Sequence, residues 1–154
     1  MLTLGVAVAL SRAARAQQKA MPVIGFLLSR SPSGPYPLAE FRKALSEMGF
    51  VEGQNVSFEP RFAENHYERL AALAADLVDR HVTVIVAAGL SSVVAAKSAT
   101  TTIPIVFWCG ADPVAQRLVA SLAAPGGNLT GLADLSSSLG AKRLGHELIK
   151  GIPL

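Results

Sequence analysis

Cysteine, aromatic residues and charge are all scarce in this 154-residue chain. Cys109 is the single cysteine, which excludes an intrachain disulfide. Charged residues make up 16% and hydrophobic residues 51% of the chain, a balance that excludes a disordered protein and fits a domain with a sizeable core. The net charge is only +3, and the basic residues are scattered among acidic ones. Without a basic stripe, no nucleic-acid partner is expected.

Motifs that mark common enzyme sites are also missing. The sequence has no Gly-x-Gly-x-x-Gly run after its first expected strand, no Gly-Lys-Ser phosphate loop and no Gly-x-Ser-x-Gly elbow. His66, His81 and His146 fall on different expected elements without metal-ligand spacing, and His146-Glu147 lacks the second histidine of a zinc-binding HExxH motif. The sequence therefore predicts a protein that is not an enzyme and needs no metal or cofactor.

The N-terminus has the pattern of an export signal. Residues 2–10 form an apolar run, much shorter than the ~20 residues that span a bilayer. Ala14-Arg15-Ala16 then matches the small-x-small cleavage pattern. We predict a signal peptide over residues 1–16, cleaved after Ala16, a linker over 17–21 and a periplasmic location. No basic residue precedes the apolar run, so a buried first element of a cytosolic domain remains the alternative.

Strand and helix patterns alternate along the rest of the chain. Apolar or alternating runs predict strands, and apolar residues at helical spacing predict helices between them. The strands are expected at 23–28, 55–59, 82–88, 103–108 and 128–132, and the helices at 38–48, 67–78, 91–99, 112–122 and 138–150. This order predicts an α/β fold, a doubly wound parallel sheet with helices on both faces, formed by residues 22–135.

In such a sheet, ligands bind beyond the carboxyl ends of the strands. Ser29 and Arg30 follow the first expected strand and offer hydrogen bonds there. Gly89 follows the third strand, and Ser91 and Ser92 begin the next helix. A glycine turn before a helix N-terminus suits a carboxylate or another small anion. The alternative is that Ser91 only caps the helix.

Asp112-Pro113 stands after the fourth expected strand. An aspartate followed by proline is a common way to begin a helix, which explains the pair structurally. The functional interpretation is that Asp112 faces the ammonium group of a ligand. The two roles are compatible, because the cap lies at the same end of the sheet.

Several segments together resemble the substrate-binding proteins of bacterial ABC transporters, of the tryptophan/tyrosine type. The matching segments, in order, are residues 14–18, 22–27, 49–56, 70–78, 101–107, 112–114, 125–131 and 140–144. The resemblance implies one lobe of a type I periplasmic binding protein. It also implies a small ligand, held between two lobes by the loops at Ser29, at 89–92 and at Asp112-Pro113, and a membrane permease as partner.

By the same resemblance, residues 136–154 would form a crossover helix toward a second lobe, so the 154 residues would be the first lobe only and bind weakly or not at all alone. Two other classes of protein are alternatives. A small flavodoxin-like enzyme or nucleotide-binding domain would need catalytic or phosphate-cradling residues in the strand-end loops. The sensor domain of a transcription regulator would need a helix-turn-helix where this chain has its leader.

Overall fold

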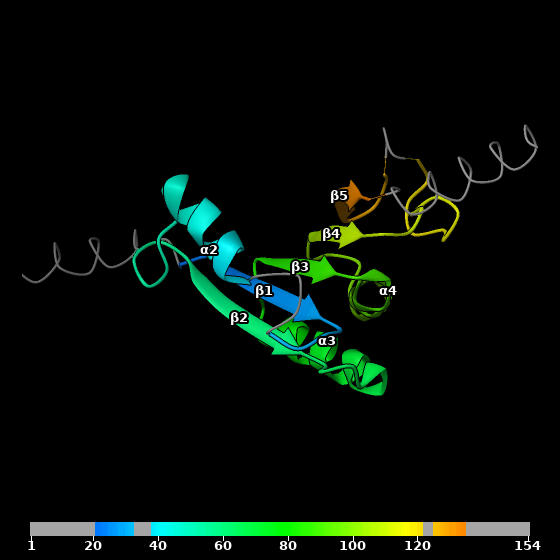
Figure 1. The fold of residues 1–154 in the computed structure, drawn as a ribbon, viewed down its shortest axis with the longest axis horizontal. Helices are drawn as coiled ribbons and strands as arrows, with labels where there is room; N and C mark the ends of the chain where they lie inside the picture. The colour runs from blue at the N-terminus through cyan, green and yellow to red at the C-terminus, as the bar shows by residue number, and fades with distance from the viewer. Residues whose placement is uncertain (1–20, 33–37, 122–124, 135–154) are drawn as a thin grey trace, which may run out of the picture.

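The computed structural model describes residues 21–32, 38–121 and 125–134. Strands and helices alternate along these residues, coloured from blue to orange in Figure 1. Their bounds are β1 Val23–Leu28, α2 Leu38–Glu47, β2 Ser57–Phe62, the 3-10 turn η2 Tyr67–Arg69, α3 Leu70–Asp79, β3 Val84–Ala88, α4 Leu90–Ala99, β4 Ile105–Cys109 and β5 Leu129–Ala133. The expected signal peptide, most of the linker and the expected last helix lie outside the described residues.

The strands form one parallel sheet in the order β2-β1-β3-β4-β5. The chain leaves β1 in one direction to make β2, then crosses back to make β3 on the other side of β1. The order therefore reverses between β1 and β3, and this switch point is where ligands bind in open α/β sheets. The predicted doubly wound sheet is confirmed.

Alternate residues of each strand point to opposite faces, and both faces are apolar. Leu27, Ile85 and Phe107 belong to the larger core under α3 and α4, and all are 3% exposed or less. Phe26 and Ala88 belong to a smaller core under α2. Helices thus cover both faces, as expected, with α2 on one side of the sheet and α3 and α4 on the other (Figure 1).

The aromatic ring of Phe41 packs α2 against its face of the sheet. The ring of Phe41 lies 5.3 Å from that of Phe26 and 6.3 Å from that of Phe58, measured between centroids. No residue of α2 is fully buried. The helix therefore covers the β1 and β2 side of this face, while Trp108 on β4 is 43% exposed.

The second strand runs from Ser57 to Phe62, later than the expected 55–59. Asn55 belongs instead to the preceding turn, where its side chain accepts from the N–H of Val51 and donates to the carbonyl of Gly49. These local bonds compete with strand pairing. As expected, the strand lies at the sheet edge, where Pro60 is tolerated.

Two helix predictions are corrected by the structure. The helix expected from residue 67 begins only at Leu70, because residues 67–69 form the 3-10 turn η2. The helix expected over 112–122 is wrong, because the chain makes successive turns there. Arg117 has φ 54°, a left-handed conformation that ends any helical path. No helix among the described residues is long and apolar enough to cross a membrane.

Candidate functional site

The loops that follow β1, β3 and β4 meet at the carboxyl end of the sheet. The N–H of Gly89 donates to the carbonyl of Trp108, within β4, at 2.8 Å, which extends the pairing of β3 and β4 into the second loop. The first and second loops lie against each other, because a Cβ placed on Gly89 would be only 3.2 Å from the hydroxyl oxygen of Ser29. The candidate residues Ser29 and Gly89 are therefore neighbours at the switch point. Arg30, the next residue, is exposed to solvent.

Gly89 directly precedes α4 and has φ 89° and ψ 144°, a conformation that L residues rarely adopt. It is the N-cap of α4, and no side chain makes a capping hydrogen bond there. The alternative that Ser91 only caps the helix is therefore contradicted. The first N–H groups of a helix carry a partial positive charge, so this end of α4 can receive the oxygen atoms of a carboxylate.

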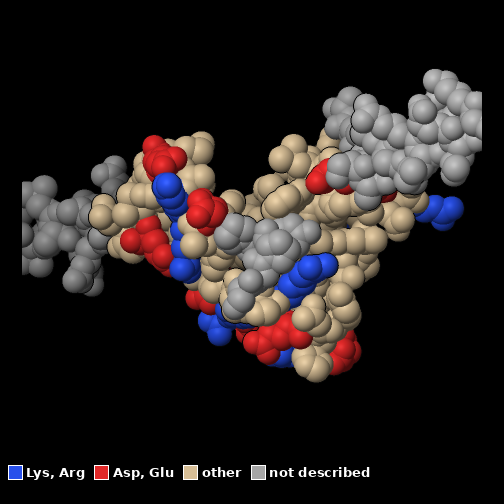
Figure 2. Space-filling view, in the orientation of Figure 1, with Lys and Arg blue, Asp and Glu red and all other residues tan. Residues whose placement is uncertain are grey.

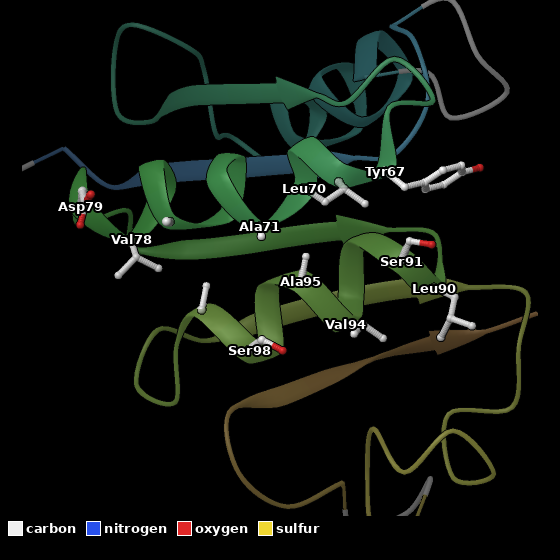
Figure 3. A pocket seen from close by; sticks show the side chains of 12 residues that line it. Tyr67, Leu70, Ala71, Val78, Asp79, Leu90, Ser91, Val94, Ala95 and Ser98 are labelled. Carbon is white, nitrogen blue, oxygen red and sulfur yellow. The ribbon is translucent and has the colours of Figure 1, made fainter.

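The two serines of α4 lie in different environments. Ser91 is exposed at the end of α4 nearest the strand ends, close to Tyr67 (Figure 3). Ser92 is fully buried, and its hydroxyl has no hydrogen-bond partner among the described residues. A buried hydroxyl without a partner is unfavourable by about 1–3 kcal/mol. The structure thus gives Ser91, and not Ser92, access to solvent.

Asp112 acts as the local cap that its sequence context predicts. Its Oδ1 accepts from the N–H of Val114 at 2.9 Å and from the N–H of Ala115 at 3.2 Å. The side chain is exposed, whereas Pro113 is fully buried. The carboxylate therefore stabilises a turn and still reaches solvent at the strand-end edge, although no helix follows it.

The end of β5 belongs to the same edge, which the sequence analysis did not predict. The N–H of Asp134 donates to the carbonyl of Cys109 at 2.9 Å. A Cβ on Gly110 would lie 3.8 Å from the carbonyl of Asp134. Asp134 lies two residues after the strand expected over 128–132, and this strand-end position was the sequence signal that could have indicated it. Cys109 itself is buried and contacts the carbonyl of Ala111, which fits a structural role.

A hollow lies elsewhere, between α3 and α4 (Figure 3). It is an open groove of about 740 Å³. Small and apolar residues line most of it, including Ala71, Ala75, Val94 and Ala95. The described strand-end loops, by contrast, form an open edge that can supply only one side of an enclosed site.

The chemistry available at this edge is recognition of a small polar molecule. Ser91 offers an exposed hydroxyl group and Ser29 a nearly buried one, α4 offers backbone N–H groups, and Arg30 and Asp112 offer charges of both signs. No three His, Cys, Asp or Glu side chains of the described part gather as metal ligands would. The groups present suit a ligand that has both an amine and a carboxylate.

Comparison with known proteins was made for the sequence and for the fold. The family model described as ABC transporter substrate binding protein matches residues 36–150, which is most of the chain. A tyrosine-binding protein from Clostridioides difficile (strain R20291) is 36% identical over 97 residues, which are 63% of this chain and 28% of that protein.

Solved structures show the same fold. A domain from Streptococcus pneumoniae in complex with L-Trp has a TM-score of 0.65 and 25% identity over 73% of this chain and 38% of its own. A ligand-free, open substrate binding protein with adhesive properties from Clostridium difficile has a TM-score of 0.64 and 30% identity, covering 71% of this chain and 38% of its own.

A conserved domain protein from Vibrio cholerae gives a TM-score of 0.66 and 31% identity, covering 75% of this chain and 39% of its own. This chain thus spans well under half the length of each of these relatives. With the family model matched over most of its residues, the chain belongs to the family of ABC transporter substrate binding proteins.

Proposed function

We propose that the chain forms the first lobe of an exported solute-binding component of an ABC importer, and that its small-molecule ligand is an amino acid. The observation that carries this proposal is the contact between Ser29 and Gly89 at the switch point of the sheet. Next to this contact α4 begins without a side-chain cap, at the same edge of the sheet as the exposed Asp112.

In the proposed binding mode, the amino acid carboxylate lies at the N-terminus of α4, and Ser29 or Ser91 donates a further hydrogen bond. Asp112 receives the ammonium group while it continues to hold its turn. The side chain of the ligand points away from this lobe. The relatives that bind tyrosine or are solved with L-Trp support an aromatic amino acid as the first ligand to test.

Since the described edge is open, we propose that a second lobe closes over the ligand and that the closed form docks on a membrane permease. Ligand pockets bury most of the surface of what they bind, which a single open edge does not do. The described residues alone should therefore bind an amino acid weakly. Binding occurs without chemical change, so no residue is assigned a catalytic role.

The proposed role of Asp112 has a direct test, because an amide can keep the turn while it loses the charge. Asp112→Asn retains an acceptor for the N–H groups of Val114 and Ala115, whereas Asp112→Ala removes it. We expect Asp112→Ala to lower the free energy of unfolding by about 1 kcal/mol and Asp112→Asn to change it little.

Both variants should weaken binding of L-tryptophan and L-tyrosine, measured by isothermal titration calorimetry on the natural polypeptide. A hydrogen-bonded charge contributes about 1.5–3 kcal/mol, so the loss should be about tenfold or more. If Asp112→Asn binds both amino acids as tightly as the unchanged protein, Asp112 is only a turn residue.

Export is a separate proposal with a separate measurement. The intact mass of the polypeptide recovered from the periplasmic fraction should correspond to a chain that begins at Gln17. Recovery only from the cytosol, with residues 1–16 retained, would contradict the export signal and leave the binding site untouched.

A further inference from the structure

A hollow at the start of β5 is lined by positive charges without any negative ones. It has a volume of about 600 Å³ and is bordered by the last turn of α4, the turns after β4 and the residues that lead into β5. Lys97 and Arg117 line it, and no Asp or Glu of the described residues does. The buried side chains of Leu118, Val119 and Leu129 complete much of the lining. We call this hollow the basic pocket.

The two cations of the basic pocket differ from most others in the described part of the chain. Figure 2 shows acidic and basic side chains side by side over α2, β2 and α3. Arg42, Arg61 and Arg80 each contact a carboxylate in this region. Lys97 and Arg117 form no ion pair with any described residue. Both charges are therefore available to an anion from outside the chain.

Lys97 is held in place by the loop that borders the pocket. Its ammonium group donates to the carbonyl of Arg117 at 2.8 Å and to that of Leu118 at 2.9 Å. These uncharged acceptors leave the positive charge in place, and an ammonium group has three N–H bonds. One N–H bond therefore remains for an anion, in a position that the two carbonyls fix.

Arg117 lies in a strained turn. Its φ of 54° is uncommon for a residue with a Cβ. Residues held in such sparsely populated conformations cluster at functional sites. The residue is exposed, and the planar guanidinium group can bind two oxygen atoms of one anion.

A glycine turn forms a third side of the basic pocket. Gly126 and Gly127 have φ of 70° and 65°. Successive N–H groups in such a turn make a concavity that binds anions. Neither N–H group donates to a carbonyl of the described residues. A Cβ on either glycine would meet nothing within 4 Å, so the space beside the turn is open to a ligand.

We propose that the basic pocket is a second small-molecule site, which binds a phosphate group or a similar oxyanion. Arg117 binds two of its oxygen atoms, Lys97 supplies the second positive charge, and the N–H groups of Gly126 and Gly127 donate to the remaining oxygens. A volume of about 600 Å³ is typical of pockets for whole small molecules, so the phosphate group can be free or part of a larger molecule. The proposal does not depend on the amino acid site, which lies at the other ends of the strands.

Inorganic phosphate is the probe that tests the proposal. The ¹⁵N-labelled natural polypeptide is titrated with sodium phosphate at constant pH, with sodium chloride to keep the ionic strength constant, and amide chemical shifts are recorded. We expect shifts at residues 117, 126 and 127 and none at residues 89–91, which belong to the proposed amino acid site. Absence of shifts at residues 117, 126 and 127 would mean that free phosphate does not bind there.

Arg117→Asn removes the charge and keeps the turn, because asparagine tolerates a positive φ and its carbonyl can still bind Lys97. It should weaken phosphate binding about tenfold, the loss expected for hydrogen bonds to a charged group. The urea midpoint should not fall. If the variant does not fold, the shifts of the unchanged polypeptide decide.

Lys43→Gln is the matched control. It removes one positive charge from an exposed position of α2, away from the basic pocket, and should leave phosphate binding unchanged. Equal weakening in Lys43→Gln and Arg117→Asn would overturn the proposal, because it would show only a diffuse attraction to the whole surface.

Vesicles distinguish a soluble phosphate from a lipid headgroup. Shifts with free phosphate, without sedimentation on phosphatidylcholine vesicles that contain phosphatidylglycerol, would identify a soluble ligand. Sedimentation that requires phosphatidylglycerol, and that Arg117→Asn abolishes but Lys43→Gln does not, would identify a headgroup. The proposal is overturned if phosphate causes no shifts at residues 117, 126 and 127 and the polypeptide does not sediment with these vesicles. The amino acid site would remain untouched by that result.

Discussion

The conformation of single residues decides the geometry of the binding edge. Gly89 is the clearest case, since its φ of 89° and ψ of 144° lie in a region almost reserved for glycine. Its lack of a Cβ also lets the loop after β3 approach the hydroxyl of Ser29. One residue thus sets the turn, the start of α4 and the contact between two loops.

Replacing Gly89 should therefore harm both stability and binding. We expect Gly89→Ala to lower the free energy of unfolding by about 1–3 kcal/mol, the usual cost of a residue held in a sparsely populated backbone region. Urea denaturation measures this. Gly110→Ala is the matched control at the same edge, because its added Cβ would meet nothing closer than 3.8 Å. Equal midpoints for the two variants would show that the Gly89 turn adapts without strain.

At the scale of elements, an ion-pair network joins the edge strand β2 to α3. The guanidinium of Arg61 contacts Oδ2 of Asp76 at 2.6 Å, and Nε of Arg80 donates to the same oxygen at 3.0 Å. The hydrogen bond from Arg61 lowers the pKa of Asp76 below its usual value of 3.8, and the second bond from Arg80 adds to this effect.

Because the folded state lowers this pKa, it favours the ionised carboxylate. The resulting stability is present above pH 3.8 and is lost as the pH falls through the lower pKa of the folded state. Asp76→Asn should therefore reduce stability at neutral pH and weaken the loss of stability in acid. Asp79→Asn, at an exposed position of the same helix, is the control. Parallel curves of unfolding free energy against pH for Asp76→Asn and the unchanged chain would contradict the network's role.

The other edge of the sheet depends on a glycine for a steric reason. A Cβ on Gly131 would collide with the backbone nitrogen and oxygen of Phe107 in the neighbouring strand. Gly131→Ala should push β5 away from β4 and lower the free energy of unfolding by about 3 kcal/mol, the upper range for overpacking.

Thr130→Ala, at an exposed position of β5, is its control and should cost less than about 1 kcal/mol. Urea denaturation of the two variants makes the comparison. A Gly131→Ala variant as stable as Thr130→Ala would mean that the two strands separate at little cost.

Most elements of the fold could be predicted from the sequence, because most strands are apolar runs and the helices α2 and α3 repeat apolar residues at helical spacing. The first strand, at 23–28, and α2 follow this pattern closely. The expected helix over 112–122 fails for a tertiary reason. The amino group of Lys97, on α4, donates to the carbonyls of Arg117 and Leu118 and stabilises the turns. No local pattern reveals a partner twenty residues away.

Only part of the site could be predicted from the sequence, because contacts between residues far apart in the chain leave no local pattern. Strand-end position alone pointed to Ser29, Gly89 and Asp112, and the structure places Ser29 and Gly89 side by side. It could not separate the exposed Ser91 from the buried Ser92, since adjacent helix residues look alike in sequence but point in different directions. Asp134 was missed because its approach to Cys109 depends on the pairing of β4 with β5.

At the scale of the whole molecule, α3 and α4 cover one face of the described sheet, and two other parts of the sheet are exposed. One is the carboxyl edge, where we propose that an amino acid and a second lobe meet. The other is the part of the α2 face formed by Val106, Trp108 and Leu132, which are 40% exposed or more. The α3–α4 groove is a separate, largely apolar surface and provides a comparison, because a ligand that binds only through apolar contact would choose it.

The central claim is that the strand-end loops bind an amino acid. It is tested most directly by a titration of the ¹⁵N-labelled chain with L-tryptophan and L-tyrosine, followed by amide chemical shifts. This measurement detects weak binding and locates it. The account predicts shifts at Ser29, at residues 89–91 and around Asp112. Shifts confined to the groove around Ala75 and Val94, or no shifts at millimolar ligand, would contradict it.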